Sequence, residues 1–386
     1  LLTFFIWVFF GGIDVVSHGL FAALSVLVVA CPCAVGLATP VALAAGLNKA
    51  ARNHILIRDT SALEQMRNVD VVVFDKTGTL TEGHPTVIGW LWAQGQEEHY
   101  KDVLLAAEST SDHPLAEAIV TALEGEEQVI PAHLDGFENI TGKGVRVAYQ
   151  GAEYWVGSHK LLKDYQANLS DILADMLTQY ESDGNSIVYF GRENDLLAVI
   201  AIKDQLRVTS MEAIRELRIQ DIEICMLTGD GERTASSVAG SLGIMRFVAD
   251  AMPDDKEDFI HKLQLQGKTV AMVGDGVNDA QALSCADVSI AMGKGTDTLM
   301  DTAMITLRTS DLLLLPKVFR LSRQTVSLMY RNLFWAFIYN TVGIFVAAGV
   351  LYPVYDILLS PALAGAAMAL SCVSVALSSL RLSSRF

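Results

Sequence analysis

The stretch DKTGTLT at residues 75–81 decides how the middle of this chain folds. It directly follows an apolar, β-branched run at residues 69–74, which predicts a buried strand ending at Asp75. A carboxylate there, followed by the amides of a Gly-containing turn and a lysine, is suited to attack a phosphoryl group whose oxygens the amides hold. On Asp75 alone an ordinary loop aspartate is the simpler interpretation, because strand-end aspartates are common in α/β sheets.

Three more segments carry residue types that bind phosphate or metal ions. Two of them follow apolar runs at 222–227 and 269–273, and the third lies at the start of a predicted helix. These segments are TGD at residues 228–230, PDDK at 253–256 and GDGVND at 274–279. A phosphoryl-transfer site needs a nucleophile, a hydroxyl and a cation that hold the phosphate oxygens, and carboxylates that hold Mg²⁺. Because the carboxyl ends of parallel strands meet at one edge of a sheet, we expect these groups to converge there.

This set of motifs resembles the phosphorylation domain of P-type ATPases, an α/β haloacid-dehalogenase-like fold. The resemblance implies that Asp75 is the phosphorylated residue. It implies catalytic roles for Lys76, Thr228, Gly229, Asp230, Lys256 and Asn278. It also implies that Mg²⁺ is bound by Asp75, Thr77 (through its carbonyl), Asp275 and Asp279. Phosphatases of this fold usually place an acid/base aspartate where this chain has Thr77, so we expect the aspartyl phosphate to outlive the transfer.

The pattern of apolar residues changes between the first and second predicted strands. It predicts a helix after Lys101, and apolar and polar residues then alternate near 145–156 and 187–202. This predicts an α+β nucleotide-binding domain at residues 83–202, inserted into a phosphorylation domain made of residues 68–82 and 203–310. His113-Pro114 alone is a turn signal, but after DKTGT it resembles the nucleotide-binding domain of the heavy-metal-transporting subclass. The resemblance implies that the adenine of ATP is surrounded by Glu108, His113, Gly142, Gly144 and Gly157. Ser158 stands where that subclass has Asn.

Composition predicts a protein that is part membrane and part soluble. Hydrophobic residues make up 51% of the chain and mean hydropathy is +0.35, yet 44 acidic and 28 basic side chains need water. Transmembrane helices are predicted at residues 19–47, 333–351 and 358–377, and residues 1–10 as the end of a truncated one. Basic residues flank these runs on one side, so the large domains are predicted to be cytoplasmic. The expected setting is that of a multi-pass protein in a bacterial inner membrane.

The transported ion is predicted from Cys31-Pro32-Cys33, because Pro32 breaks the helix and soft thiolates favour Cu(I). Two small apolar core residues are the alternative interpretation of these cysteines. Resemblance to type IB pumps extends to Tyr339, Asn340, Met368 and Ser371, a pattern similar to the monovalent copper group. Zinc, cadmium and lead pumps are expected to carry charged residues in the last two helices, and both runs here are uncharged.

The implied activity is ATP-driven export of monovalent copper through an aspartyl phosphate, with ATP and Mg²⁺ as cofactors. Implied partners are the lipid bilayer and a cytosolic copper chaperone as metal donor. A silver or other soft-metal pump stays open, as does a non-catalytic metal-binding membrane module. The chain contains no Thr-Gly-Glu and starts at Leu1 within an apolar run, so we expect a fragment without the actuator domain. The net charge of −16 argues against a nucleic-acid partner.

The five cysteines do not form the even, regular pattern of a disulfide framework, so reduced thiols are expected. Cys225 and Cys285 are predicted to pack in the core. Cys372 and Gln281 depart from the family pattern. We expect Cys372 to be a buried structural residue, with an added thiol on the metal path as the alternative interpretation. We expect Gln281 to have little effect on the chemistry.

Overall fold

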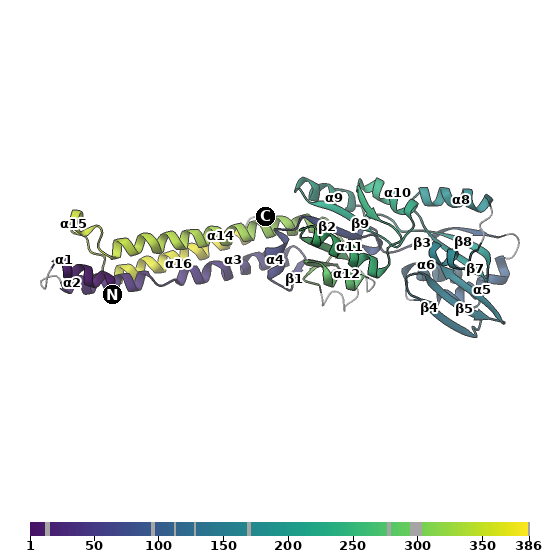
Figure 1. The fold of residues 1–386 in the computed structure, drawn as a ribbon, viewed down its shortest axis with the longest axis horizontal. Coiled ribbons are helices and arrows are strands. Elements are labelled where there is room, and N and C mark those ends of the chain that lie inside the picture. Colours follow the sequence, from purple (N-terminus) through teal and green to yellow (C-terminus); the bar gives the residue numbers. More distant parts are fainter. Residues whose placement is uncertain are drawn as a thin grey trace. The chain divides into compact units, whose positions relative to one another are not determined.

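The computed structural model divides into two units, Leu1–Arg67 with Lys317–Phe386 and Asn68–Pro316 (Figure 1). It describes residues 1–11, 16–93, 97–111, 113–126, 129–167, 171–275, 279–293 and 303–384. Each unit is described here by itself.

A parallel sheet forms the centre of the unit Asn68–Pro316, with strand order β13-β12-β11-β2-β9-β10. The strands are β2 (Val71–Asp75), β9 (Glu223–Leu227), β10 (Arg246–Val248), β11 (Val270–Gly274), β12 (Val288–Met292) and β13 (Ile305–Leu307). Strands β2, β11 and β12 are buried along their whole length, as expected of a parallel sheet covered on both faces. The three strands predicted from apolar runs are thus confirmed, each shifted by a residue or two.

The register of this sheet aligns the ends of its central strands. Asp75 pairs with Leu227, and Phe74 pairs with Val273, so the loops after β2, β9 and β11 leave the same edge. The covering helices are α9 (Ser210–Ile219), α10 (Glu232–Leu242), α11 (Pro253–Leu265) and α12 (Ala280–Cys285). This common edge is where we expected the reacting groups from the sequence.

A second, antiparallel sheet lies in the chain between β2 and β9, with strand order β3-β8-β7-β6-β5-β4. Its strands are β3 (Thr86–Trp92), β4 (Gly136–Ile140), β5 (Gly144–Tyr149), β6 (Ala152–Gly157), β7 (Ser186–Arg192) and β8 (Asp195–Lys203). Its helices are α5 (Glu97–Glu108), α6 (Pro114–Glu124), α7 (His159–Asp164) and α8 (Asp171–Ser182). It has its own cores, one built on Phe190 and Ile200 and another on Trp155 and Tyr189. This is the topology of one domain inserted into a loop of another.

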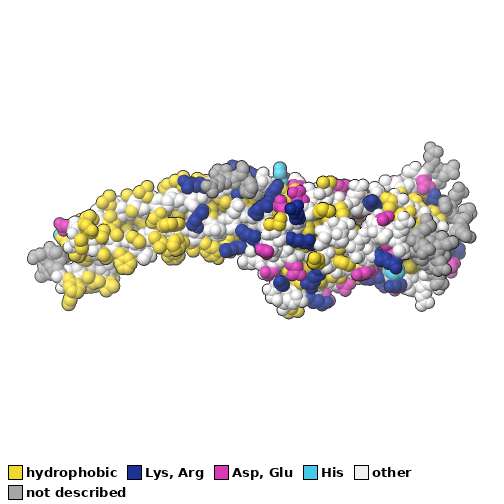
Figure 2. Space-filling model, turned by 90° about the horizontal axis from the view of Figure 1, so that it is seen from above, with side chains coloured by type: hydrophobic (Ala, Val, Ile, Leu, Met, Phe, Trp, Pro, Cys, Tyr) yellow, Lys and Arg dark blue, Asp and Glu magenta, His cyan; other side chains and the backbone are white. Residues whose placement is uncertain are grey.

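The other unit is built mainly from helices. They are α1 (Leu2–Gly11), α2 (Val16–Val29), α3 (Cys33–Arg52), α4 (Ser61–Met66), α14 (Leu314–Ala347), α15 (Tyr352–Tyr355) and α16 (Pro361–Ser384), with the short strand β1 (Ile55–Ile57). Within the described residues, two helical segments are long and apolar enough to cross a membrane, Val16–Arg52 and Pro361–Leu382. Hydrophobic side chains cover much of the helical surface in the view of Figure 2. Small residues such as Ala34, Ala38 and Ala336 let the helices pack closely.

Helix boundaries in this unit differ from the predicted spans. The span predicted at 19–47 is two helices separated at residues 30–32, because Pro32 cannot continue the ladder of α2. The span predicted at 333–351 is part of α14, which begins at Leu314 and ends before Gly349, whose φ of +95° suits a helix terminus. The span predicted at 358–377 is α16, which begins at Pro361, a favoured first helical residue, and continues to Ser384.

Candidate active site

Asp75 ends β2 and is almost completely buried, with 6% of its surface exposed. One carboxylate oxygen, Oδ2, accepts a hydrogen bond from the Thr77 amide at 3.1 Å. The other, Oδ1, accepts one from Lys256 Nζ at 2.6 Å. The predicted nucleophile is therefore held by a cation on one side and by a backbone amide on the other.

Two further carboxylates surround this group. Lys256 Nζ also contacts Asp279 Oδ1 at 2.7 Å, and one oxygen from each of Asp75, Asp275 and Asp279 lies within 4.8 Å of the others. Burial first, and then the charges of Asp75 and Asp279, raise the pKa of Asp275 to about 7. Burial alone would lower the pKa of Lys256, but the two carboxylates beside it raise it above its ordinary value, so Lys256 stays protonated.

This carboxylate cluster fits Mg²⁺. Hard carboxylate oxygens are the ligands that Mg²⁺ prefers. A divalent cation would also offset the burial and the neighbouring carboxylate charges that raise the pKa of Asp275. The predicted ligands Asp75, Asp275 and Asp279 are thus brought together. Thr77 donates its amide to Asp75, and the role predicted for its carbonyl oxygen stays a prediction.

The turn after Asp75 requires glycine at position 78. Gly78 has φ of +70°, and a Cβ built there would lie 1.4 Å from Asp275 Oδ2. Arg207 stabilises the same turn by donating from Nε to the Thr79 carbonyl at 2.9 Å and from its terminal nitrogen to the Gly78 carbonyl. The hydroxyl of Thr81 donates to Asp204. The turn therefore lies against Asp275 and is held by residues just beyond β8.

Arg207 and Asp204 did not come out of the sequence reasoning. Both lie directly after β8, where the inserted domain returns to the parallel sheet. The available signal was a pair of opposite charges next to an apolar strand at a domain boundary. The burial of Arg207, which is only 7% exposed, is seen in the structure alone.

We predict that Gly78→Ala lowers the rate of Mg²⁺-dependent phosphorylation of the chain at least about tenfold, with a loss of about 1–3 kcal/mol in unfolding free energy. The added methyl group must displace the Asp275 carboxylate, and it also strains a left-handed backbone. Gly151→Ala is the matched control, because Gly151 has φ of +77° but nothing within 4 Å of its Cβ position. Phosphorylation kinetics and denaturant unfolding measure the two effects. Equal phosphorylation rates in both variants would contradict the predicted clash.

The loop after β9 is linked to the DKTGT turn through Lys76. Lys76 forms an ion pair with Asp230 and donates to Ser186 Oγ at 3.1 Å, and Ser186 Oγ donates to Asp230 at 2.8 Å. Thr228 Oγ1 donates to the same carboxylate at 3.0 Å. Burial would raise the pKa of Asp230, but the charge of Lys76 and these hydrogen bonds lower it overall.

The structure therefore separates the predicted catalytic residues into two connected groups. Asp75, Lys256, Asp275 and Asp279 form the first, and Lys76, Thr228 and Asp230 form the second. Gly229 lies in the turn between Thr228 and Asp230. Asn278 lies outside the described residues. Ser186, from the inserted domain, was missed because nothing in its sequence surroundings marks it.

Two predicted nucleotide contacts lie at helix ends of the inserted domain. Glu108, the last residue of α5, is 6% exposed, and burial raises its pKa to about 7. His113 caps α6, with Nδ1 accepting from the Leu115 amide at 3.2 Å. The neutral ring then carries its proton on Nε2, which can donate to a ligand. Although the His113 side chain is solvent-accessible, desolvation by nearby protein lowers its pKa, while the charge of Asp230 opposes this.

The predicted glycines allow close backbone approach. A Cβ at Gly144 would lie 2.1 Å from the Val156 carbonyl oxygen, and a Cβ at Gly157 would lie 2.1 Å from that of Lys143. Gly142 has φ of +68° in the turn before β5. Beside them, the buried Ser158 Oγ has no hydrogen-bond partner among the described residues. These glycines shape the turn whether or not they touch a nucleotide, and their predicted nucleotide contacts stay predictions.

We predict that nucleotide affinity falls as the pH drops below about 7, and that Glu108→Gln removes most of this dependence. With a pKa raised to about 7, Glu108 is protonated below that pH and is a weaker acceptor for an adenine amino group. Linkage limits the effect to about tenfold in Kd per pH unit. Calorimetric titration with ADP at pH 6 and pH 8 measures it, and the mutant corrects for titration of the nucleotide itself. Parallel pH profiles in both proteins would contradict the assignment of Glu108.

The sequence model of the haloacid dehalogenase-like hydrolase family matches residues 69–287, more than half of the chain. The chain belongs to this family. It is also 43% identical over 381 residues to a copper-exporting P-type ATPase of Legionella pneumophila, covering 99% of this chain and 52% of the relative. It is 44% identical over 386 residues to a silver exporting P-type ATPase of Salmonella typhimurium, covering 99% of this chain and 46% of the relative. The chain thus spans about half the length of the curated relatives it matches.

Solved structures give the same result for the fold. A zinc-transporting PIB-type ATPase in the E2.Pi state is 33% identical, with a TM-score of 0.67 over 95% of this chain and 58% of that one. The catalytic domain of the CPx-ATPase CopB-B is 28% identical, with a TM-score of 0.59 over 70% of this chain and 96% of that one. The predicted resemblance to P-type ATPases and the predicted haloacid-dehalogenase-like fold are confirmed.

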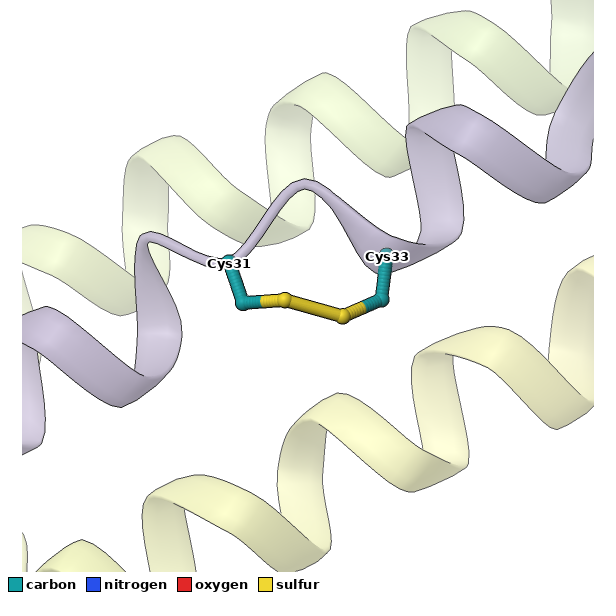
Figure 3. The surroundings of a disulfide bond; sticks show 2 residues. All are labelled: Cys31 and Cys33. Atoms are coloured by element: carbon teal, nitrogen blue, oxygen red, sulfur yellow. A yellow bond between two sulfur atoms is a disulfide. The ribbon is translucent and has the colours of Figure 1, made fainter.

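In the helical unit of this haloacid dehalogenase-like chain, Cys31 and Cys33 are joined by a disulfide, with their Cα atoms 5.5 Å apart (Figure 3). The expectation of reduced thiols is wrong for this pair. The physical reason is the helix break at Pro32, which leaves both side chains on one side of the chain within bonding reach. A disulfide carries no thiolate, so the predicted metal ligands require this bond to be reduced.

The structure places the other predicted membrane ligands in different surroundings. Met368 packs with Val29 and Ala347 in one buried cluster. Asn340 Oδ1 and Ser371 Oγ are buried and have no hydrogen-bond partner among the described residues. The roles predicted for Asn340 and Ser371 as metal ligands stay predictions. Tyr339 is 44% exposed, with its ring near Trp335, and its predicted role as a ligand stays a prediction.

Two cysteines outside the disulfide differ in burial. Cys225 is fully buried in the parallel-sheet core, as predicted. Cys285 is only partly buried, so its predicted place in the core is wrong: it ends α12, where its thiol faces Glu257 on α11. Cys372 is partly buried and packs beside Ala34, Ala38 and Val375. Gln281 is exposed on α12.

Proposed function

We propose that this chain carries the phosphorylation and metal-binding machinery of an ATP-driven exporter of monovalent copper. The observation that carries this proposal is the environment of Asp75, whose two oxygens accept from Lys256 and from the Thr77 amide beside two more carboxylates. A buried carboxylate held in this way is oriented for attack on a phosphoryl group.

In the proposed reaction a carboxylate oxygen of Asp75 forms a bond to the γ-phosphorus of ATP, and the bond from that phosphorus to the β–γ bridging oxygen breaks. ADP leaves with the bonding electrons. Lys256 offsets the negative charge that gathers around Asp75. The hydroxyl of Thr228, which donates to Asp230 in this structure, would turn to the phosphate oxygens. Mg²⁺ held by Asp75, Asp275 and Asp279 would neutralise further phosphate charge.

The lifetime of the resulting acyl phosphate separates a pump from a phosphatase. The residue two positions after Asp75 is Thr77, which cannot supply the proton transfer that an aspartate supplies there. The acyl phosphate then persists until another part of the protein acts on it. This supports coupling to transport over simple hydrolysis.

The nucleotide is proposed to bind on the inserted domain. The buried carboxylate of Glu108 and the Nε2 proton of His113 are complementary to the donor and acceptor groups at the edge of adenine. Desolvation lowers the pKa of His113, and the charges of Asp230 and Lys76 also act on it, so His113 lies within electrostatic reach of the loops after β2 and β9. This placement suits a nucleotide whose base and phosphates contact different domains.

The proposed cargo is Cu⁺, carried past Cys31 and Cys33 in their reduced form. Soft thiolates, the thioether of Met368 and the absence of charge from residues 333–351 and 358–377 favour a soft monovalent ion. Silver shares this chemistry, and one relative is named a silver exporter. The proposed setting is a bacterial inner membrane with both large domains in the cytoplasm and a cytosolic copper chaperone as metal donor.

Acid-stable labelling by γ-phosphate-labelled ATP tests the proposal. We expect Mg²⁺-dependent label on the detergent-solubilised chain, and in the exporter a response to Cu⁺ that exceeds the response to Zn²⁺. A metal-binding module would acquire no label, and a phosphatase would release phosphate rapidly without transported metal. Parallel reactions with Ag⁺ compare the two soft ions.

A further inference from the structure

A second group of metal-ligand side chains lies on the phosphorylation domain, between α11 and the end of α12. Glu257 and His261 are one helical turn apart on α11, and Cys285 is the last residue of α12. One ligand atom from each lies within 4.8 Å of the others. None of these residues belongs to the carboxylate cluster around Asp75.

The distances in this group match those between ligands of one tetrahedral ion. Cys285 Sγ lies 3.4 Å from Glu257 Oε1, and His261 Nε2 lies 3.6 Å from the same oxygen. Usual zinc–ligand bond lengths of about 2.0–2.3 Å at tetrahedral angles give sulfur–oxygen and nitrogen–oxygen separations of about 3.4–3.6 Å. The two separations from Glu257 Oε1 therefore match those between corners of one coordination polyhedron, and the ligand atoms of His261 and Cys285 lie within 4.8 Å of each other.

Gln264 orients the imidazole for this role. Gln264 Nε2 donates to the Cys285 carbonyl at 2.9 Å, so Gln264 Oε1 is the atom that faces His261 Nδ1 at 3.2 Å. An amide oxygen only accepts, so His261 Nδ1 carries the proton. In the neutral ring Nε2 then carries the lone pair and lies 3.6 Å from Glu257 Oε1. Histidines that bind a metal through one nitrogen commonly donate their other N–H to an oxygen in this way.

Without a cation this arrangement places a lone pair 3.6 Å from a carboxylate oxygen. The Cys285 thiol donates to Glu257 Oε1, so it keeps its proton when no metal is bound. A bound metal ion would displace that proton to solvent and accept the thiolate, the imidazole and the carboxylate together. The side chains of His261 and Glu257 are 51% and 36% exposed, so an ion can enter from solvent.

We propose that Glu257, His261 and Cys285 form a surface site for a divalent transition-metal ion of the zinc class, with Gln264 as its positioning residue. One sulfur, one nitrogen and one oxygen ligand suit Zn²⁺ and select against Mg²⁺, which prefers oxygen ligands alone. Three protein ligands leave a fourth position for water. The site is separate from the proposed copper path and needs no nucleotide.

Co²⁺ used as a spectroscopic substitute for Zn²⁺ tests the site. The full chain in detergent carries Cys31→Ser and Cys33→Ser to remove the other metal-binding thiols, and excess Mg²⁺ occupies the carboxylate cluster. We expect one equivalent of Co²⁺ to give a thiolate-to-metal charge-transfer band and the intense visible bands of a tetrahedral ion. Zn²⁺ should abolish both by displacement.

Four variants separate this site from adventitious binding. Cys285→Ser should remove the charge-transfer band, and His261→Gln should weaken Zn²⁺ at least about tenfold in competition with a chromogenic chelator. Gln264→Ala, which removes no ligand, should weaken Zn²⁺ by about 10–100-fold. His133→Gln, at an exposed histidine elsewhere, should change nothing. A band that persists in Cys285→Ser, or equal Zn²⁺ affinity in all four variants, would overturn the proposal. Nucleotide labelling is not involved, so the result is independent of the proposed pump activity.

Discussion

Asp75→Asn is expected to abolish acid-stable labelling by ATP while nucleotide binding is kept. An amide cannot form the acyl phosphate, so the phosphorylation rate should fall at least about 1,000-fold, equivalent to about 4 kcal/mol of activation free energy. The fold should survive, because Lys256 keeps its contact with Asp279 at 2.7 Å and Gly78 keeps its place beside Asp275.

The measurement is labelling by γ-phosphate-labelled ATP, quenched in acid, with nucleotide affinity determined on the same sample. Asp258→Asn is the matched control, since it removes an exposed carboxylate from α11, the helix that carries Lys256. It should label like the parent. Acid-stable label that persists in Asp75→Asn would place the phosphorylated residue elsewhere.

The second large effect is expected in the membrane unit. The double variant Cys31→Ser/Cys33→Ser should lose high-affinity Cu⁺ binding, with Kd rising at least about 1,000-fold, or about 4 kcal/mol. Serine is nearly isosteric with cysteine but is a hard, poorly ionised ligand, so packing around Met368 should be kept while soft-metal affinity falls. Because Cys31 and Cys33 form a disulfide, the parent should bind Cu⁺ tightly only after reduction.

Competition with a calibrated Cu⁺ chelator on the detergent-solubilised chain measures this affinity, before and after treatment with a thiol-free reductant. Cys372→Ser is the matched control, because Cys372 lies in the same helical unit but outside the disulfide. Unchanged Cu⁺ affinity in the double variant would refute the assignment of this pair. Tight binding by the oxidised parent would assign the metal to other groups.

Local sequence determined the elements and the positions of the reacting groups. Continuous β-branched runs ending in Gly or Asp predicted β2, β9 and β11, because a buried parallel strand needs apolar residues on both faces. Once these strands are adjacent and parallel, their common polarity brings Asp75, Thr228 and Asp275 to one edge. Short-range pattern and sheet geometry were therefore sufficient for the centre of the candidate active site.

Tertiary structure alone decided which side chains complete these groups. Arg207 holds the Gly78 turn, Ser186 joins Lys76 to Asp230, and Cys285 meets Glu257, although no local pattern links the members of any of these sets. The helix break at Pro32 was predictable from proline chemistry, but the disulfide it permits was not. The physical reason is the same throughout: such contacts depend on how far one element is shifted and turned against another, and that is set by packing between residues distant in the chain.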